Sequence, residues 1–308
     1  MSLQNFIPEV WSQQLLIALR KTHIWAQDMV VNRDYEGDIA SLGDRVHVNS
    51  HSEVIVRDYD KQSTSGDGTD PQDNTGTQLV RQRLSSTRRT LVIDQAKYFN
   101  FEIDDVDQAQ QSPKIMQEAM NDAAYQLADV ADKHVAGKIS DVQAANKLGT
   151  DSDPLGFSGN TGVEKAYDTL VDLATLLDEA NVPQTGRWAI VPPWYRGLLR
   201  KDDRFVATGD GNAESARANG EVGEAAGFRI MVSNNTATGV HSTDQTWYAV
   251  TAGYRGACSH AEQIASVEAY RPEDAFSDAV KGLHLYGTKL IRPDGWAVAY
   301  TDRAKSPA

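Results

Sequence analysis

A long amphipathic helix is the clearest structural signal in this sequence. Ser112 can cap the free amides of a helix, and Pro113 suits the first turn, where a missing N–H costs nothing. Apolar residues then recur every four positions along one face: Ile115, Ala119, Ala123 and Leu127. No glycine or second proline interrupts the pattern before Gly137. We therefore expect a helix over residues 112–138, about 40 Å long, which exceeds the width of a small domain.

A polar two-stranded arm is expected before this helix. Residues 45–59 alternate between apolar and polar side chains, and residues 77–93 have the character of a returning strand. The intervening residues 60–76 are rich in Gly, Asp, Ser and Thr, which is typical of a loop tip. An isolated two-stranded hairpin is only marginally stable in water, so we expect this arm to lie on a partner surface.

Charge differs between this arm and the segment that leads into the helix. The returning strand carries a group of arginines: Arg81, Arg83, Arg88 and Arg89. The segment before the helix carries a group of acidic residues: Glu102, Asp104, Asp105 and Asp107. The two groups can pair within one subunit or between copies, where a repeated network sets register and orientation. The alternative for the arginines is a solvated strand face. A nucleic-acid role is disfavoured because no aromatic residue lies among them.

Aromatic and apolar side chains are concentrated near the N-terminus, at Phe6, Ile7, Trp11 and Trp25. Terminal segments fray unless something holds them, so these side chains need a surface on which to dock. Two surfaces are available, the core of the same chain and a neighbouring subunit. We favour the neighbouring subunit, because aromatic surface at a chain end often marks an interface.

The second half of the chain has an α/β pattern. Residues 147–160 are rich in Gly, Asp, Ser and Pro, and we place a linker and a domain boundary there. A helix is expected over residues 161–181. Segments with strand character follow at residues 187–191, 228–232 and 247–251. Residues 283–291 and 296–300 are expected to form a C-terminal hairpin.

Composition argues against several classes of protein. With 308 residues, 40% of them hydrophobic and 24% charged, the chain suits a folded protein of one large or two ordinary domains. A formal net charge of −13 disfavours a protein that clamps nucleic acid, because phosphate contacts need clustered Lys and Arg. The single cysteine, Cys258, excludes an internal disulfide. We expect a soluble protein made in the cytoplasm, since neither a secretion signal nor a membrane-length apolar run occurs.

No group of residues in the sequence predicts an enzyme. The glycine-rich segments 209–214 and 220–227 lack the complete pattern of a dinucleotide-binding loop. His47 and His51 share a strand face, but no third metal ligand is obvious. Cys258 is near His260 in the sequence, yet we expect a packed apolar residue there rather than a nucleophile. We therefore predict no catalytic, cofactor-binding or metal-binding residues.

Several short motifs, in their order and spacing, resemble the major capsid proteins of tailed double-stranded-DNA bacteriophages. That fold is shared with the herpesvirus capsid floor and with encapsulin shells. The motifs lie at residues 6–11, 34–37, 43–44, 101–107, 188–193, 202–205, 227–228 and 233–235. The resemblance covers most of the chain and implies an α+β fold of four parts. These are an N-terminal arm (1–43), an extended β-hairpin loop (44–95), a peripheral domain (96–154 and 271–308, with a spine helix at 112–138) and an α/β axial domain (155–270).

The resemblance also implies a function. The chain is expected to self-assemble into pentamers and hexamers of an icosahedral phage head that encloses double-stranded DNA, without sequence-specific binding. The implied partners are further copies of the chain, a separate scaffolding protein and a portal protein, with no membrane. No scaffold segment is expected to be fused to the chain, because it begins almost directly at the arm. Assembly is expected in the host bacterial cytoplasm, and the final location is the virion.

Finer expectations follow from the same resemblance. Small hinge changes near Gly43 and Gly149 are expected to let one chain form both kinds of ring. Some family members cross-link through a loop lysine, but we expect no such link at Lys61, for which no partner residues are identified. The candidate inter-subunit contacts are Phe6, Ile7, Trp11, Arg81, Arg83, Arg88, Arg89, Glu102, Asp104, Asp105 and Asp107. The alternatives are an encapsulin-like bacterial nanocompartment shell and, from another class, a soluble ligand-binding or metal-binding enzyme.

Overall fold

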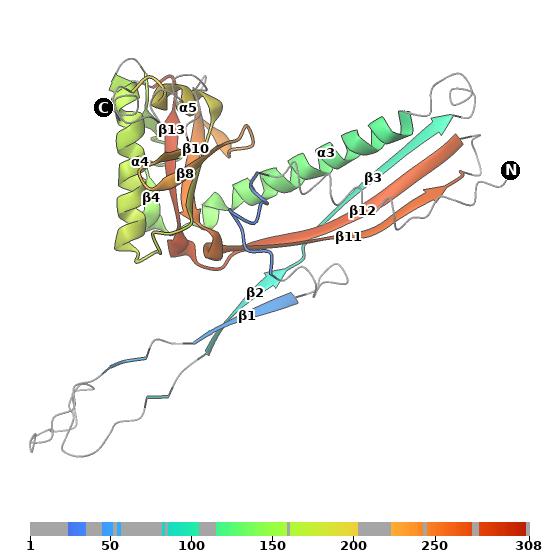
Figure 1. Ribbon diagram of the computed structural model, residues 1–308, viewed down its shortest axis with the longest axis horizontal. Coiled ribbons are helices and arrows are strands. Elements are labelled where there is room, and N and C mark those ends of the chain that lie inside the picture. Colours follow the sequence, from blue (N-terminus) through green and yellow to red (C-terminus); the bar gives the residue numbers. More distant parts are fainter. Residues whose placement is uncertain are drawn as a thin grey trace, which may run out of the picture. The chain divides into compact units, whose positions relative to one another are not determined.

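The computed structural model describes residues 24–34, 45–51, 54–56, 82–83, 86–104, 115–158, 161–202, 223–242, 245–272 and 277–305 (Figure 1). The chain divides into two units, a small one over Val46–Leu91 and a large one formed by the rest of the chain. The strands of the small unit are β1 (Arg45–His51) and β2 (Ser86–Val92), which pair in a two-stranded sheet. Strand character is therefore confirmed for residues 45–51 and 86–92, whereas residues 54–56 and 82–83 of the expected strands lie outside β1 and β2.

In the large unit, a three-stranded antiparallel sheet supports the long helix. The strand order is β11 (Cys258–Tyr270), β12 (Ser277–Leu290) and β3 (Gln95–Asp104). The helix α3 (Ile115–Ala136) runs along one face of this sheet (Figure 1). Helix and sheet share a core of apolar side chains: Met120, Ala124, Leu127, Ala128, Val267, Val280, Phe99 and Phe101.

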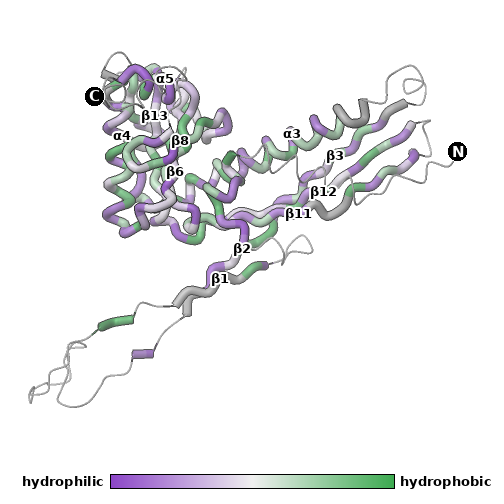
Figure 2. The backbone as a smooth tube through the Cα atoms, viewed as in Figure 1, coloured by the Kyte–Doolittle hydropathy of each residue, from purple (hydrophilic) through white to green (hydrophobic). Residues whose placement is uncertain are grey.

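The helix predicted over residues 112–138 is confirmed within the part of the chain that is described. It ends at Ala136, where the 3₁₀ turn η2 (Gly137–Asp141) begins. Hydrophobic and hydrophilic stretches alternate along α3, as expected for an amphipathic helix (Figure 2). The buried stripe is rotated slightly from the expected one, because Ala124 is buried whereas Ala123 is only half-buried.

A mixed eight-stranded sheet forms the other half of the large unit. The strand order is β4-β13-β10-β6-β8-β7, with β5 paired to β13 and β9 paired to β10. The strands are β4 (Lys147–Leu148), β5 (Leu155–Gly156), β6 (Arg187–Val191), β7 (Glu224–Ala225), β8 (Phe228–Val232), β9 (Thr238–Ser242), β10 (Gln245–Tyr254) and β13 (Trp296–Asp302). A short 3₁₀ turn, η3 (Ala144–Asn146), leads into β4.

Both faces of this sheet are covered, which explains why β6 and β13 are buried at every residue. One face packs on α4 (Thr161–Glu179) and α5 (Pro193–Leu199), with Leu173 and Leu199 in that core. The opposite face packs on residues 24–31 and on the end of α3, with Trp188 in that core. The buried strand expected over residues 187–191 is confirmed.

The end of α4 shows how local sequence stops a helix. Asn181 adopts a left-handed backbone conformation, with φ of 55°. The N–H of Val182 then donates to the carbonyl of Leu177 at 3.0 Å, and the N–H of Asn181 donates to the carbonyl of Asp178 at 3.0 Å. This pair of hydrogen bonds satisfies the last carbonyls of the helix, and asparagine tolerates the required φ better than most residues. The expected helix end near Asn181 is confirmed.

Strand pairing differs from two expectations. The expected linker at residues 147–160 carries β4 and β5, which both pair in parallel with β13. Backbone hydrogen bonds suffice to add two-residue strands to a sheet, so the polar sequence gives no sign of them. The expected C-terminal hairpin is wrong, because β12 pairs with β11 and β3 whereas β13 pairs with β10. The 3₁₀ turn η5 (Pro293–Gly295) carries the chain from one sheet into the other.

Candidate inter-subunit surfaces

The small unit exposes both apolar and basic side chains. Val54, Ile55 and Val56 are 64%, 58% and 91% exposed, although three consecutive apolar residues are normally covered. The N–H of Ile55 donates to the Gln82 side-chain oxygen at 2.8 Å, which ties the two sides of the arm together. Among the predicted contact residues, the exposed arginines that the structure describes are Arg83, Arg88 and Arg89. Apolar contact area and positive charge are therefore available side by side in one segment.

The predicted acidic patch is only partly described. Glu102 is exposed on β3, where its carboxylate accepts a hydrogen bond from the Ser277 hydroxyl at 3.2 Å. Asp104 is the last residue of β3. The remaining candidates lie outside the described residues: Phe6, Ile7, Trp11, Arg81, Asp105 and Asp107. Since the arginines and the acidic residues belong to different units, their pairing stays a prediction.

Sequence reasoning missed an aromatic surface on the three-stranded sheet. Tyr98 on β3 is 78% exposed, and Tyr270 on β11 is 37% exposed. The side-chain amide of Asn100 donates to the Tyr270 hydroxyl at 3.0 Å, and the Lys281 ammonium lies 5.2 Å from the Tyr270 ring centroid. We call this the outer face of the sheet. The alternation of Tyr98 and Asn100 with the buried-side Phe99 would have indicated it.

The segment Ile24–Asp34, which we call the strap, is held by its own chain rather than by a neighbour. Trp25, Ala26, Val30 and Val31 are all fully buried. The preference for a neighbouring subunit is therefore wrong for Trp25, which lies against the core of the same chain. The physical reason for this burial is that α4 and α5 cover one face of the eight-stranded sheet only. The strap covers part of the opposite apolar face.

Trp25 packs between two tryptophans of the eight-stranded sheet. Its ring centroid lies 6.2 Å from that of Trp188 and 6.3 Å from that of Trp296. Trp188 and Trp296 contact each other edge to face at 5.4 Å. Gly253 makes room for the group, because a Cβ there would lie 2.5 Å from the Trp296 ring. The three indoles form one interlocked cluster that anchors the start of the strap.

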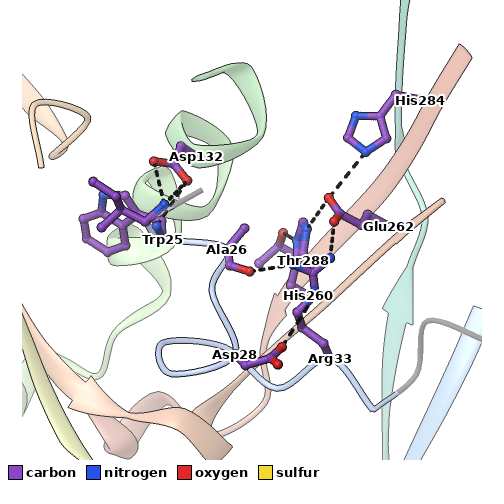
Figure 3. A network of polar contacts seen from close by, with 10 residues as sticks. Trp25, Ala26, Asp28, Arg33, Asp132, His260, Glu262, His284 and Thr288 are labelled. Carbon is purple, nitrogen blue, oxygen red and sulfur yellow. Dashed lines mark hydrogen bonds and ion pairs between the residues drawn. The ribbon is translucent and has the colours of Figure 1, made fainter. Parts of the chain in front are cut away.

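A buried carboxylate on α3 holds the backbone beside Trp25. Asp132 Oδ1 accepts hydrogen bonds from the N–H groups of Ile24 and Trp25, both at 3.1 Å (Figure 3). The Asn235 amide lies 3.5 Å from Asp132 Oδ2. Burial raises the pKa of Asp132 to about 6, even though these hydrogen bonds act in the opposite direction.

A second buried charge cluster holds the far end of the strap (Figure 3). Arg33 forms an ion pair and hydrogen bond with Glu262 on β11 and donates to the Ala26 carbonyl at 2.9 Å. Glu262 Oε2 also faces His260 Nε2 at 3.5 Å and His284 Nε2 at 3.4 Å. Burial alone raises the pKa of Glu262, but the two histidines and Arg33 outweigh it and hold that pKa well below its ordinary value.

The cluster is fixed in place by hydrogen bonds around it. His260 Nδ1 lies 2.8 Å from the Thr288 hydroxyl on β12. The Asn32 N–H donates to the Cys258 carbonyl at 2.8 Å, and the His260 N–H donates to the Asn32 carbonyl at 3.0 Å. Cys258 is buried in the adjacent core, which raises the pKa of its thiol, and the expectation of a packed apolar residue is confirmed.

These clusters have the geometry of anchors for the strap. Within the described ranges, no three His, Cys, Asp or Glu side chains are arranged to hold a metal ion. None of the helices described above is long and apolar enough to cross a bilayer. The polar groups around the strap form hydrogen bonds with its backbone. Their role in this structure is therefore to hold the strap in place.

Comparison with family models identifies one family. The model of a family described as phage capsid protein matches residues 88–299, which is well over half of the chain. None of the curated proteins matches the chain at a significant level.

Solved structures resemble the chain over nearly its full length. A structure of Mycobacterium phage Che8 is 28% identical in sequence and covers 96% of this chain and 98% of its own, with a TM-score of 0.67. The capsid of the cyanophage P-SCSP1u is 19% identical and covers 86% of this chain and 85% of its own, with a TM-score of 0.62. A virus-like particle from Pyrococcus furiosus is 14% identical and covers 94% and 98%, with a TM-score of 0.51.

Proposed function

The chain belongs to the phage capsid protein family, and on this premise we propose that its copies form the pentamers and hexamers of an icosahedral head that encloses double-stranded DNA. The α+β fold of phage major capsid proteins, expected from the resemblance, is confirmed. The protein is accordingly a structural, non-enzymatic component of the virion shell. The proposal concerns which rings the copies form, how they contact each other and what they enclose.

One observation carries the proposal for how copies contact each other. The small unit presents Val54, Ile55 and Val56 to solvent, each more than half exposed. Covering such residues with a second copy removes apolar area from water and gives the two-stranded arm the surface that it needs. A contact between heterologous surfaces, repeated by symmetry, closes into rings and shells.

We assign the receiving surface to the three-stranded sheet of a neighbouring copy. Its outer face offers the exposed Tyr98 and Tyr270, and Glu102 adds negative charge beside them. Apolar and aromatic residues suit the exposed valines of the arm, and the carboxylate suits Arg88 and Arg89. Phe6, Ile7 and Trp11 provide a second contact, in which the N-terminal arm docks on another copy.

The remaining proposed partners follow from family membership and charge. A separate scaffolding protein and a portal protein are proposed for assembly in the bacterial cytoplasm. Packaged DNA is proposed to contact the shell weakly and without sequence preference, because a net charge of −13 repels phosphate. An encapsulin-like compartment is the second candidate, since the Pyrococcus furiosus virus-like particle shares the fold. The content of particles purified from the native source separates the two, because nucleic acid supports a phage head and a protein cargo supports a compartment.

Electron microscopy of the purified protein tests the assembly proposal directly. We expect closed shells or rings from the unaltered chain, and few of them after Arg88→Glu with Arg89→Glu. The matched control is Arg229→Glu with Arg303→Glu, which reverses two exposed arginines of the large unit. Normal shells from the Arg88 and Arg89 variant would show that the charge of the arm is not used. A chain that remains a folded monomer under all conditions would overturn the proposed function.

A further inference from the structure

The two sheets of the large unit are joined at a junction by two chain crossings and by a shared core, in which Cys258 and Leu290 cluster with Trp188. Strand β10 leads into β11 through the 3₁₀ turn η4 (Arg255–Ala257), and β12 leads into β13 through η5. The two turns lie side by side, because the N–H groups of Ile291 and Arg292 both donate to the Ala257 carbonyl, at 2.8 and 2.9 Å. A Cβ at Gly295 would lie 2.5 Å from the Ala257 Cβ. Any change in the angle between the sheets would have to be absorbed at these two crossings.

The strap crosses this junction and contacts both sheets. Its first residues bind the eight-stranded sheet, where Trp25 packs on β6 and β13 through Trp188 and Trp296. Its last residues bind the three-stranded sheet, where Asn32 exchanges backbone hydrogen bonds with β11 and Arg33 pairs with Glu262. A segment fixed at one end to each sheet resists any change in the angle between them.

We propose that the strap, Ile24–Asp34, is a releasable lock on the angle between the two sheets. This inference rests on the proposed function in one respect, namely that the N-terminal residues preceding the strap bind a neighbouring copy. Binding of those residues by a neighbouring copy then acts on Trp25 through the continuous chain. The assembly state of the N-terminal arm therefore determines whether the lock is closed and which angle the subunit adopts.

The charges at the two ends make this lock specific for one arrangement. Asp132 belongs to α3, whereas Glu262 and His260 belong to β11. His284 and Thr288 on β12 complete the far end (Figure 3). A buried ion pair adds little net stability when it is complete but costs much when one partner is lost. Asp132 and Glu262 both belong to the half that contains the three-stranded sheet, whereas Trp25 packs on the eight-stranded sheet. If the sheets turn, the strap cannot keep both sets of contacts, so the docked strap tolerates a single angle.

Spin-label distances in the full-length subunit test the lock. Thr175→Cys on α4 and Tyr98→Cys on β3 place labels at exposed positions of the two halves, with Cys258→Ala to remove the native thiol. Hydrogen exchange of the peptide that covers the strap reports docking in the same proteins. We expect one narrow distance distribution and slow exchange when the strap is intact.

Two substitutions open the lock, and each has a matched control. Arg33→Gln and Asp132→Asn together are expected to speed exchange of the strap by about tenfold or more and to broaden or shift the distances. Asp129→Asn on the same helix and Arg303→Gln, at an exposed position after β13, remove like charges away from the strap and are expected to leave both readouts unchanged. If the double variant is not folded, Arg33→Gln alone is measured, since it leaves the Asp132 end of the strap unaltered.

Two results overturn the inference. One is faster exchange of the strap with an unaltered distance distribution, because the strap then does not control the angle. The other is unaltered exchange in the charge variants, because the buried charges then do not hold the strap. Electron microscopy of the same proteins keeps this test separate from the proposed function. Absence of shells from the unaltered chain contradicts the function alone, since the distances are measured in the isolated subunit.

Discussion

Trp25 and Val56 lie 31 positions apart in the sequence, and both are large apolar residues in turn-rich surroundings, yet Trp25 is fully buried and Val56 is 91% exposed. The strap that contains Trp25 is anchored at a tryptophan cluster, at Asp132 and at Glu262. The small unit that contains Val56 has a two-stranded sheet and no comparable cluster among its described residues. The comparison shows that two apolar regions of one chain can differ, one anchored within the subunit and the other left exposed on it.

The division also changes where the proposed external contact begins. The expected N-terminal arm over residues 1–43 includes the strap, which the structure assigns to the body of the subunit. External contact by the arm is therefore proposed only for residues that precede Ile24, including Phe6, Ile7 and Trp11. The strap connects that proposed contact to the core, whereas a separate contact is proposed for the small unit.

The largest expected effect comes from removing the anchor of the strap. Trp25→Ala is expected to lower the free energy of unfolding by about 3–5 kcal/mol, because it deletes a fully buried indole and leaves a cavity between Trp188 and Trp296. Chemical denaturation of the isolated subunit measures this. Tyr98→Ala removes an exposed ring and is expected to change the same quantity by less than about 0.5 kcal/mol. Equal losses in the two variants would erase the distinction between anchored and free aromatic residues.

The buried ion pair gives the next effect. Glu262→Gln removes the buried carboxylate that pairs with Arg33, whose ion pair with the exposed Asp28 is longer, at 3.9 Å, and we expect the free energy of unfolding to fall by about 3 kcal/mol. Glu268→Gln on the same strand removes an exposed partner of Lys281, for which we expect less than about 0.5 kcal/mol. Urea denaturation at pH 7 measures both variants. A Glu262→Gln protein as stable as the Glu268→Gln protein would mean that the strap does not depend on this pair.

The pH dependence of stability isolates the other end of the strap. The pKa of Asp132 is raised from 3.8 to about 6 in the folded protein, so the folded state prefers the protonated carboxyl. Its contribution is therefore greatest below pH 4 and is lost as the pH rises through 6. The stability of the unaltered protein minus that of Asp132→Asn is expected to fall by about 2–3 kcal/mol between pH 4 and pH 7.

Asp129 provides the control for this measurement, because it lies on the same helix with the opposite shift. The hydrogen bond from Lys133 lowers the pKa of Asp129. Its contribution is present above its ordinary pKa and is lost as the pH falls through the lowered value, so the slope has the other sign. Parallel profiles for the Asp132→Asn and Asp129→Asn proteins would contradict the assignment of the buried carboxyl.

The smallest effect on stability is expected in the small unit. There a substitution is expected to change shell assembly strongly while it leaves the free energy of unfolding almost unaltered. Val56→Asp places a charge on a side chain that is already exposed, so the free energy of unfolding is expected to change by less than about 0.5 kcal/mol. Shell yield measured by sedimentation is expected to fall by about tenfold, because the charge must be buried at the proposed contact. Val171→Asp, at an exposed position of α4, is the control. Unchanged shell yield would remove Val56 from the contact.

Local patterns predicted local structure well. The spacing of apolar residues predicted α3, the apolar run at residues 187–191 predicted β6, and Asn181 marked the end of α4. Each of these depends on neighbours within a few positions in the sequence. The fold as a whole was predicted from the resemblance to phage capsid proteins. The order of the shared motifs carries information about long-range arrangement, which the periodicity of apolar residues does not carry.

Long-range pairing is what the sequence alone did not reveal. Trp296 begins a strand that joins β10 rather than the preceding β12, because η5 redirects the chain between sheets. Arg33 and Glu262 are separated by 229 positions, and neither is unusual in its local sequence. The anchoring of the strap became visible only when the tertiary structure brought these residues together.

The burial of Cys258 makes the reactivity of its thiol a measure of local opening in the unmodified protein. It is the single thiol of the chain, it is fully buried, and its carbonyl accepts the hydrogen bond from Asn32 in the strap. A thiol reagent can modify it only during excursions that uncover the start of β11. The rate of thiol modification would then report how often this region opens. The rate can be compared between isolated subunits and finished particles without introducing a label.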